Sequence, residues 1–261
     1  MLSVYDLKKS FDGLTVFDGF SLTVPRGGFT ALVGPSGCGK STFFDVLTGV
    51  VRKDRGEISW CGNSLPHVGR SAAYMQQKDL LLPWLTLFEN AMLPEKISGT
   101  EESSRDKAEY LFKRLGLNGF EEYLPHKVSG GMRQRCALVR TLMFEHELVL
   151  LDEPLSALDA ITRRSLQTLL LLLQSEFRKT IVMITHDVEE ALLLADEVLV
   201  LTTFPMEIRE RFVLAKPKPR RSDEHDLLRI KEYVIELLQG EAAEGTVPVS
   251  VTRPVTEVGG A

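Results

Sequence analysis

A glycine-rich stretch at residues 34–42 constrains the fold more than any other part of the chain. It reads Gly-Pro-Ser-Gly-Cys-Gly-Lys-Ser-Thr and fits the pattern G-x-x-x-x-G-K-[ST]. The apolar run before it, residues 29–33, predicts a strand, and residues 41–48 predict a helix that ends at Gly49. A buried strand that runs through a tight turn into a helix predicts an α/β fold.

This stretch has the chemistry of a phosphate-binding loop. Glycines let the backbone N–H groups of a tight turn point inward around an anion, and the N-terminus of the following helix adds partial positive charge. We expect the Lys40 ammonium to contact the β- and γ-phosphates of a nucleotide and the Ser41 hydroxyl to bind Mg²⁺. A chance match is expected in about one chain in a hundred of this length at average residue usage, so the motif predicts a nucleotide site.

Two further apolar runs end in polar residues that suit the same site. Residues 148–151 are followed by Asp152 and Glu153, and residues 181–185 are followed by His186. Strands that are apolar on both faces and alternate with helices predict a parallel sheet, and their carboxyl ends meet at one edge. We expect Asp152 to hold Mg²⁺, Glu153 to polarise the attacking water and His186 to contact the γ-phosphate.

The other periodic segments divide the chain into parts. Further strands are predicted at residues 2–7, 20–24, 57–60 and 198–201, and helices at 105–115, 160–179 and 188–195. We expect a nucleotide-binding core at residues 1–79 and 146–210, a helical subdomain at 80–145, a C-terminal linker and helix at 211–240, and a mobile tail at 241–261. In the linker, Lys-Pro-Lys-Pro-Arg-Arg at 216–221 predicts a stiff basic segment, and a short helix is expected from about 223 to 238.

Composition and charge exclude several classes of protein. The net charge of −5 is a poor match to nucleic-acid binding, which favours a basic surface. Cys38, Cys61 and Cys136 are odd in number and have no C-x-x-C spacing, so we expect reduced thiols rather than disulfides or a zinc site. Residues 1–10 show no signal peptide, and no apolar run is long enough to cross a bilayer. We therefore expect any membrane role to come through a partner.

A segment just upstream of the acidic strand resembles a known family. Residues 129–135 (Ser-Gly-Gly-Met-Arg-Gln-Arg) resemble the signature sequence of ATP-binding cassette (ABC) ATPases. Residues 156–159 (Ser-Ala-Leu-Asp) resemble the D-loop of that family, and His186 falls at its switch histidine. The resemblance covers about residues 1–240, with all motifs in the family's order. The departures are Val128, where the family usually has Leu, and Val-Arg-Thr at 139–141, where small residues are more usual.

Two further assignments come from the resemblance alone. Gln77 falls at the Q-loop glutamine, a position that contacts nucleotide and Mg²⁺ in the family. Gln76 is adjacent, and the spacing to Pro83 favours Gln77. Phe11 falls at the aromatic residue that stacks on adenine, although an aromatic residue near an N-terminal strand is also typical of a core.

The resemblance implies a specific architecture and assembly. The fold would be a P-loop NTPase (RecA-like) core with a small antiparallel β subdomain and an inserted helical subdomain. Two copies would form a head-to-tail dimer in which Ser129, Gly130 and Gly131 of one copy face the γ-phosphate held by the other. A serine and two glycines that open a helix form a second anion site. Glu153 would be the general base, with ATP and Mg²⁺ as the cofactors.

One segment resembles a particular group within the family. Residues 81–86 (Leu-Leu-Pro-Trp-Leu-Thr) and the Lys-Pro-Arg-rich linker are similar to importers of nitrate, sulfonates and taurine, and to related importers of pyrimidine thiamine precursors. The resemblance implies the motor subunit of a bacterial importer, peripheral on the cytoplasmic face of the inner membrane. It would contact integral membrane permease subunits directly and an extracytoplasmic solute-binding protein indirectly. Trp84 and Leu85 are candidates for the permease contact or for the core of the helical subdomain.

Three other functions compete with the importer hypothesis. They are the ATPase of an exporter or lipoprotein-release system, a soluble ABC ATPase that acts on DNA or ribosomes, and a non-catalytic nucleotide-binding module. The predicted catalytic residues are Lys40, Glu153 and His186, and the predicted metal ligands are Ser41, Gln77 and Asp152. The residues predicted to bind nucleotide are Phe11, Gly34, Pro35, Ser36, Gly37, Cys38, Gly39, Lys40, Ser41, Thr42, Gln77, Ser129, Gly130, Gly131 and Asp159.

Overall fold

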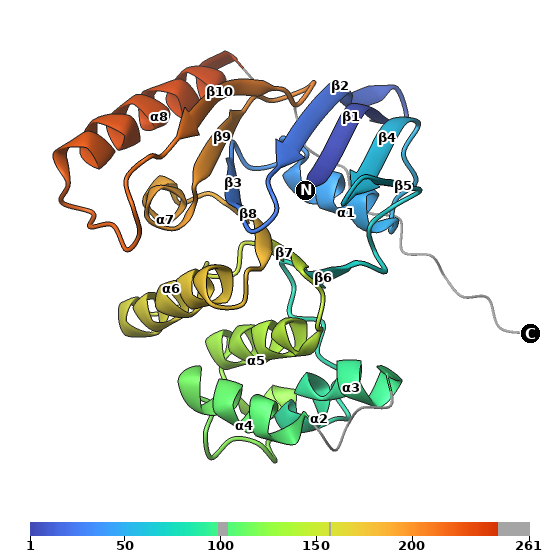
Figure 1. Cartoon of the computed structure of the whole chain (residues 1–261), viewed down its shortest axis with the longest axis vertical. Helices are drawn as coiled ribbons and strands as arrows, with labels where there is room; N and C mark the ends of the chain where they lie inside the picture. The colour runs from blue at the N-terminus through green and yellow to red at the C-terminus, as the bar shows by residue number, and fades with distance from the viewer. Residues whose placement is uncertain (99–103, 157, 245–261) are drawn as a thin grey trace, which may run out of the picture.

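The structure is a computed structural model that describes residues 1–98, 104–156 and 158–244 (Figure 1). Its strands are β1 (Leu2–Phe11), β2 (Leu14–Val24), β3 (Phe29–Val33), β4 (Arg55–Trp60), β5 (Asn63–Leu65), β6 (Ala72–Met75), β7 (Leu148–Asp152), β8 (Thr180–Thr185), β9 (Glu197–Leu201) and β10 (Ile208–Val213). Its helices are α1 (Lys40–Thr48), α2 (Leu87–Ala91), α3 (Leu93–Ser98), α4 (Arg105–Arg114), α5 (Gly130–Met143), α6 (Ala160–Ser175), α7 (Val188–Leu194) and α8 (His225–Glu244), with a 3₁₀ turn at Pro125–Lys127.

The central sheet brings the predicted site residues to one edge. Within the described residues its strand order is β10-β9-β3-β8-β7-β6, and all neighbours are parallel except β10 and β9. Val33 at the end of β3 is level with Thr185 at the end of β8, and Asp152 of β7 is level with Ile184. The carboxyl ends of β3, β7 and β8 therefore meet, as expected for a parallel α/β sheet.

Both faces of this sheet are covered, which explains why its strands are apolar throughout. Along β7, Leu148 and Leu150 pack against α1 and the antiparallel sheet, whereas Val149 and Leu151 pack toward α5 and α6. This alternation is the two-residue period of a strand. The predicted parallel sheet with two covered faces is confirmed.

A second, antiparallel sheet packs over α1. Its strand order is β2-β1-β4-β5 within the described residues. Phe43 of α1 lies against Phe17 and Phe20 of β2, with ring centroids 6.2 and 5.0 Å apart. These edge-to-face contacts anchor the helix that follows the phosphate loop. Helix α1 ends at Gly49, whose φ of 83° is the left-handed cap that glycine favours.

A helical layer of α2, α3, α4 and α5 lies below β6 and β7 in Figure 1, away from α1 and the antiparallel sheet. Helix α2 begins with a capping box between Thr86 and Glu89, and α5 packs on α2 and α4. Asn90 of α2 is fully buried and holds the preceding loop: its side chain accepts from Leu82 N and donates to the carbonyls of Leu82, Leu85 and Thr86. The loop that carries Trp84 is therefore fixed from beneath.

The C-terminal part differs from the sequence-based expectation. Strand β10 was not predicted, because it lies at the edge of the sheet and residues 209–211 in its middle are charged. The expected boundary at 210 falls inside it. Helix α8 extends to Glu244, beyond the expected end near 238. Of the tail expected to be mobile, residues 245–261 lie outside the described part of the chain. No helix within the described part is long and apolar enough to cross a membrane.

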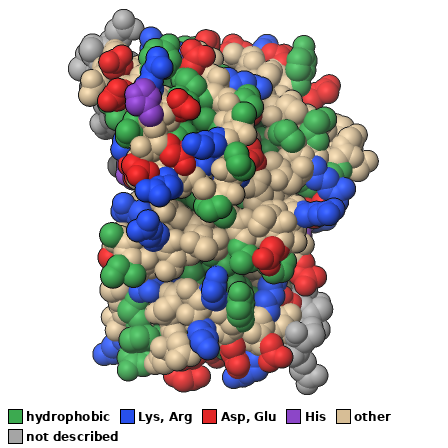
Figure 2. All heavy atoms as spheres, turned by 60° about the vertical axis from the view of Figure 1, so that its left-hand side comes forward, with side chains coloured by type: hydrophobic (Ala, Val, Ile, Leu, Met, Phe, Trp, Pro, Cys, Tyr) green, Lys and Arg blue, Asp and Glu red, His purple; other side chains and the backbone are tan. Residues whose placement is uncertain are grey.

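The basic linker is anchored rather than solvated. Arg220 is only 7% exposed, and its guanidinium donates to the carbonyls of Leu192, Ala195, Leu214 and Lys216 at 2.6 to 3.0 Å. Two of these carbonyls belong to the last turn of α7 and its cap, where positive charge is favourable. On the face that Figure 2 presents, acidic and basic side chains are interspersed, with hydrophobic side chains scattered between them.

Candidate functional site

The loop between β3 and α1 has the backbone conformation that its glycines allow. Gly37 and Gly39 have φ values of 83° and 111°, and a Cβ on Gly39 would lie 2.5 Å from the Cγ1 of Val16. Lys40 is 7% exposed, and its ammonium donates to Gly34 O at 2.8 Å and Pro35 O at 2.7 Å. The lysine thus folds back onto its own loop, and its charge is satisfied by carbonyls that a phosphate would replace.

Two adjoining cavities lie beside this loop. One, of about 180 Å³, is lined by loop residues, the start of α1, Gln77, Glu153 and Ile184. The other, of about 270 Å³, is lined by residues that include Ser41, Gln76, Gln77 and Asp152. Ser41 and Gln77 line both cavities, whereas Gln76 lines only the second. This arrangement supports Gln77 over Gln76 as the residue nearer the phosphate loop.

The environment of Asp152 suits a divalent cation. Asp152 is 2% exposed and its Oδ1 has no hydrogen-bond partner. Burial raises the pKa of its carboxyl group to about 6, and the negative charges of Glu153 and Asp45 also raise this pKa. A hydrogen bond from Ser41 acts in the opposite direction and lowers it. An unpaired buried carboxylate oxygen beside a hydroxyl and an amide side chain fits the all-oxygen ligand set of Mg²⁺. Ser41, Asp152 and Gln77 are the residues that would hold it.

Glu153 and His186 meet across the tips of β7 and β8. The Nδ1 of His186 lies 3.4 Å from the Oε2 of Glu153, and their side chains are 58% and 18% exposed. Glu153 has a φ of 50°, which costs about 1–2 kcal/mol for a residue with a Cβ. Its amide donates to Ile184 O at 2.9 Å, and its carbonyl accepts from Gln134 Nε2 at 2.9 Å. These bonds hold Glu153 in the strained conformation that aims its carboxylate at the first cavity.

The signature segment lies apart from this cavity in the same chain. Ser129 caps α5 by accepting from Met132 N at 3.2 Å, and Ser129 and Gly130 are exposed. Helix α5 belongs to the helical layer, away from α1 (Figure 1). Asp159 caps α6 by accepting from the amides of Ile161 and Thr162. The structure therefore brings the loop, Gln77, Asp152, Glu153 and His186 together, and leaves Ser129–Gly131 and Asp159 outside the two cavities.

Two aromatic residues with open interpretations are both exposed. Phe11 is 40% exposed at the end of β1, with the Lys9 ammonium 4.6 Å from its ring centroid, and it is not part of the buried core. Trp84 is 71% exposed, which rules out the core interpretation for this residue, whereas Leu85 is half-buried. Phe11 lines neither cavity, so its assignment to adenine stays a prediction.

Sequence patterns gave no role to Gln134, although it lies within the signature segment. It is 6% exposed and joins α5 to the loop after β7, because its Nε2 reaches both Glu153 O and Ser156 Oγ. A single glutamine in a helix does not form a recognisable sequence pattern. Only its position within the signature segment could have indicated a role for it.

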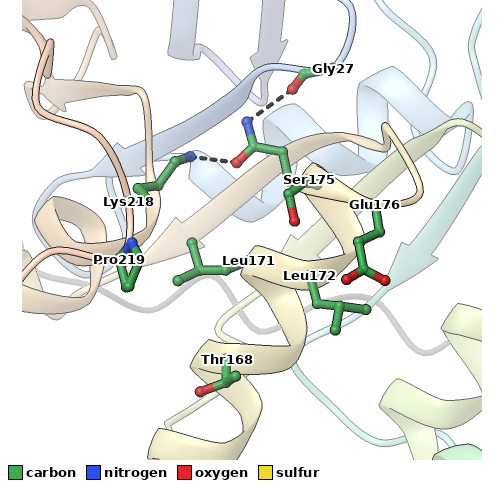
Figure 3. Close-up of a pocket in the computed structure, with 9 residues that line it drawn as sticks. Gly27, Thr168, Leu171, Leu172, Ser175, Glu176, Lys218 and Pro219 are labelled. Carbon is green, nitrogen blue, oxygen red and sulfur yellow. Dashed lines mark hydrogen bonds between the residues drawn. The ribbon is translucent and has the colours of Figure 1, made fainter.

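A larger cavity of about 610 Å³ lies at the opposite end of α6 (Figure 3). Its walls include Leu171 and Leu172 of α6 and Pro219 of the linker. The Lys218 ammonium at its floor is already paired with Gln174, with Leu194 O at 2.9 Å and with Asp196 at 2.6 Å. This lysine has no donor left for a ligand, because its three donors are taken by Gln174, Leu194 and Asp196.

Comparisons with known proteins point to one family. A family model described as ABC transporter matches residues 17–156. An uncharacterized ABC transporter ATP-binding protein of Methanocaldococcus jannaschii is 34% identical over 245 residues, 92% of each chain. The taurine import ATP-binding protein TauB of Escherichia coli O157:H7 is 34% identical over 244 residues, 90% of this chain and 96% of its own. The dimeric ATP-binding cassette MJ0796, bound to ADP and Pi after hydrolysis, matches with a TM-score of 0.75 at 25% identity, covering 83% of this chain and 100% of its own.

Proposed function

Since the chain belongs to the ABC transporter family, we propose that it is the subunit that hydrolyses ATP to drive a membrane importer. The observation that supports this most directly is the convergence at one sheet edge. The phosphate loop, the Asp152 carboxylate with its unpaired Oδ1 and the Glu153–His186 contact come from three neighbouring strands, and all of these residues except His186 line the two adjoining cavities. A non-catalytic binding module would have no need of the last two features.

Each residue of the site has a separate role in phosphoryl transfer. Lys40 exchanges the carbonyls of Gly34 and Pro35 for β- and γ-phosphate oxygens. Ser41, Gln77 and Asp152 would hold Mg²⁺, which would supply positive charge beside the phosphates when bound. The Glu153 carboxylate orients the attacking water and accepts its proton.

His186 has two tasks in this arrangement. Its Nδ1 holds the Oε2 of Glu153 at 3.4 Å, and its 58% exposed ring is free to contact the γ-phosphate. Amides of the glycine-rich loop stabilise the negative charge that develops on the transferred group. The site is preorganised on strand ends rather than on long loops, which favours precise positioning of the reacting atoms.

A second copy of the chain would complete the site. The exposed N-terminus of α5 with Ser129, Gly130 and Gly131 is a suitable anion site, yet it lies outside the cavities of its own chain. A head-to-tail dimer would bring it to the γ-phosphate held by the other copy, with Asp159 near the interface. The dimeric cassettes among the solved structures support this assembly.

The partner at the membrane would dock on the helical layer. Trp84 is 71% exposed on a loop that Asn90 fixes from beneath, so its indole is displayed at little entropic cost. We infer that this loop contacts a permease subunit at the cytoplasmic face of the inner membrane. The taurine importer among the relatives supports a small oxyanion such as a sulfonate or nitrate as the solute, with pyrimidine thiamine precursors as the other class.

The test is to trap the Glu153→Gln variant with ATP in native membranes and identify the proteins that co-purify with it. Recovery of a polytopic membrane subunit together with a solute-binding protein is the expected result. Recovery of ribosomal or DNA-bound proteins without a permease would overturn the importer assignment and leave ATP hydrolysis in place.

A further inference from the structure

We propose that Arg163 and Glu190 form a positioning pair that sets the place of His186 against Glu153 and links it to Leu158, next to the cap of α6. The inference rests on the proposed function, since it concerns the same ATP site. Neither residue touches the cavities beside the phosphate loop, so both act through other residues rather than as catalytic groups.

Two consecutive glutamates lie in the first turn of α7, just after His186 and Asp187, and they face different neighbours. Glu189 pairs with Lys231 of α8 at 2.5 Å, and its side chain is 40% exposed. Glu190 is 5% exposed and lies 3.5 Å from the Nε of Arg163 in α6. The Glu189–Lys231 pair joins α7 to the C-terminal helix α8. The Glu190–Arg163 pair joins α7 to α6, on the side of the helix that faces the protein interior.

The buried carboxylate of Glu190 holds the residue before His186 directly and the residue after it through the Thr185 hydroxyl. Its Oε2 accepts from the Oγ1 of Thr185 at 3.0 Å, and the same Oγ1 accepts from the amide of Asp187 at 3.0 Å. Thr185 and Asp187 are the two neighbours of His186 in the chain, and Thr185 is 2% exposed. A shift of the Glu190 carboxylate therefore moves the backbone on each side of the histidine.

Arg163 connects this carboxylate to the segment before α6. Its NH2 group donates to Leu158 O at 3.2 Å, and Leu158 immediately precedes Asp159, the cap of α6. The Nε of Arg163 is buried and makes no hydrogen bond, although it lies 3.5 Å from Glu190 Oε1. A small movement of the N-terminus of α6 would close or open this contact, because hydrogen-bond strength falls steeply beyond about 3.2 Å.

The series of contacts is continuous from one functional segment to another. It runs from Leu158 O through Arg163 and Glu190 to Thr185, and reaches His186, which contacts Glu153 at 3.4 Å. A pair that served only to hold α6 against α7 would have no need to bond the turn at His186. A charged side chain that is nearly buried, as Glu190 is, is costly unless paired, so loss of Arg163 displaces the Glu190 carboxylate.

The experiment measures single-turnover ATP hydrolysis and ATP affinity in the full chain with Mg²⁺. Arg163→Met and Glu190→Gln should each lower the rate of hydrolysis by about tenfold to a hundredfold, as expected for a misplaced catalytic group. ATP affinity should change by less than about twofold, and the double variant should be no slower than the slower single variant. Arg163→Lys, which keeps the charge, should recover part of the rate.

The decisive comparison is made in a His186→Ala background. If the pair acts through His186, adding Arg163→Met there should change the rate by less than about twofold. The matched control is Glu189→Gln with Lys231→Met, which breaks the pair on the other side of the same helical turn and should leave hydrolysis unchanged. Thermal midpoints show which variants are folded. If Arg163→Met does not fold, Arg163→Lys and Glu190→Gln replace it in the comparison.

Two results would overturn the inference while leaving the proposed function intact. One is a native rate of hydrolysis in Arg163→Met and Glu190→Gln, and the other is an equal loss with and without His186, which would mark the pair as merely structural. A native chain without ATPase activity, or a His186→Ala variant with native turnover, would instead overturn the proposed chemistry of the site and the inference with it.

Discussion

Replacement of Arg220 by alanine tests whether the C-terminal linker is part of the folded core. The guanidinium is 7% exposed and donates four hydrogen bonds, to Leu192 O, Ala195 O, Leu214 O and Lys216 O. These carbonyls belong to the end of α7, the end of β10 and the linker, so one side chain joins three segments. Truncation leaves the carbonyls without their donor and removes the connection between the linker and α7.

The expected loss of stability follows from these four bonds. Hydrogen bonds to a charged group contribute about 1.5–3 kcal/mol each, but neighbouring bonds do not add fully. The substitution also removes the cost of burying a guanidinium, and water enters the space to satisfy part of the exposed carbonyls. We therefore expect a loss of about 3–5 kcal/mol in the free energy of unfolding, and a fall of about 10 °C in Tm for a chain of this size.

Differential scanning calorimetry and urea unfolding give both quantities. The matched control is Arg221→Ala at the next position, where the side chain is 78% exposed and pairs only with the exposed Asp223. That variant should unfold at the native temperature, because exposed ion pairs contribute little. An Arg220→Ala variant as stable as Arg221→Ala would show that the linker is not anchored, and would refute the assignment of its buried contacts.

Three further predictions concern catalysis, pH and the membrane partner. Glu153→Gln should lower ATP turnover by about a hundredfold or more while ATP binding is kept, measured by phosphate release and equilibrium binding; native turnover would exclude Glu153 as the general base. Burial raises the pKa of the Cys136 thiol from 9.0 to about 12, so the folded chain holds this proton more tightly than the unfolded chain. The resulting stability is complete below pH 9 and is lost as pH rises toward 12, which amounts to about 1.4 kcal/mol between pH 8 and pH 10. Urea unfolding at both pH values should show a loss that is larger by about 1.4 kcal/mol in the native chain than in Cys136→Ala, because the variant keeps the Cys38 thiol, whose pKa burial also raises. Equal losses in both would contradict the assignment. Trp84→Ser should leave Tm and the ATPase rate of the isolated chain unchanged, because the indole is 71% exposed, but should abolish co-purification with a permease; an undiminished yield of the permease would move the contact elsewhere.

Much of the site was predictable because it rests on strand order and chain direction. The parallel strands β7 and β8 place Asp152, Glu153 and His186 at one edge whatever their detailed contacts. Local patterns also predicted the tight glycine-rich turn, in which Gly37 and Gly39 have positive φ, and the end of α1 at Gly49. These features depend on residues close together in sequence, or on a rule that applies to every parallel sheet.

Contacts set by packing were beyond the sequence patterns. The linker run at 216–221 has the composition of a solvated segment, yet Arg220 is buried because carbonyls from α7 and β10 converge there. Glu190 follows Glu189 in the chain, and nothing in that pair of letters distinguishes the buried carboxylate from the exposed one. The difference arises from which helix packs on each side of α7, which is a property of the tertiary structure.

The folded-back Lys40 has a consequence for which small molecules the loop rejects. Its ammonium already has two carbonyl acceptors and lies 3.6 Å from the Cys38 sulfur, so an incoming molecule has to compete with the chain's own oxygens. An anionic polyphosphate offers stronger acceptors and wins that exchange, whereas an uncharged nucleoside offers none at this position. An exchange of partners at the Lys40 ammonium would therefore contribute to discrimination between adenosine and ATP, through charge rather than through a steric filter against the smaller molecule.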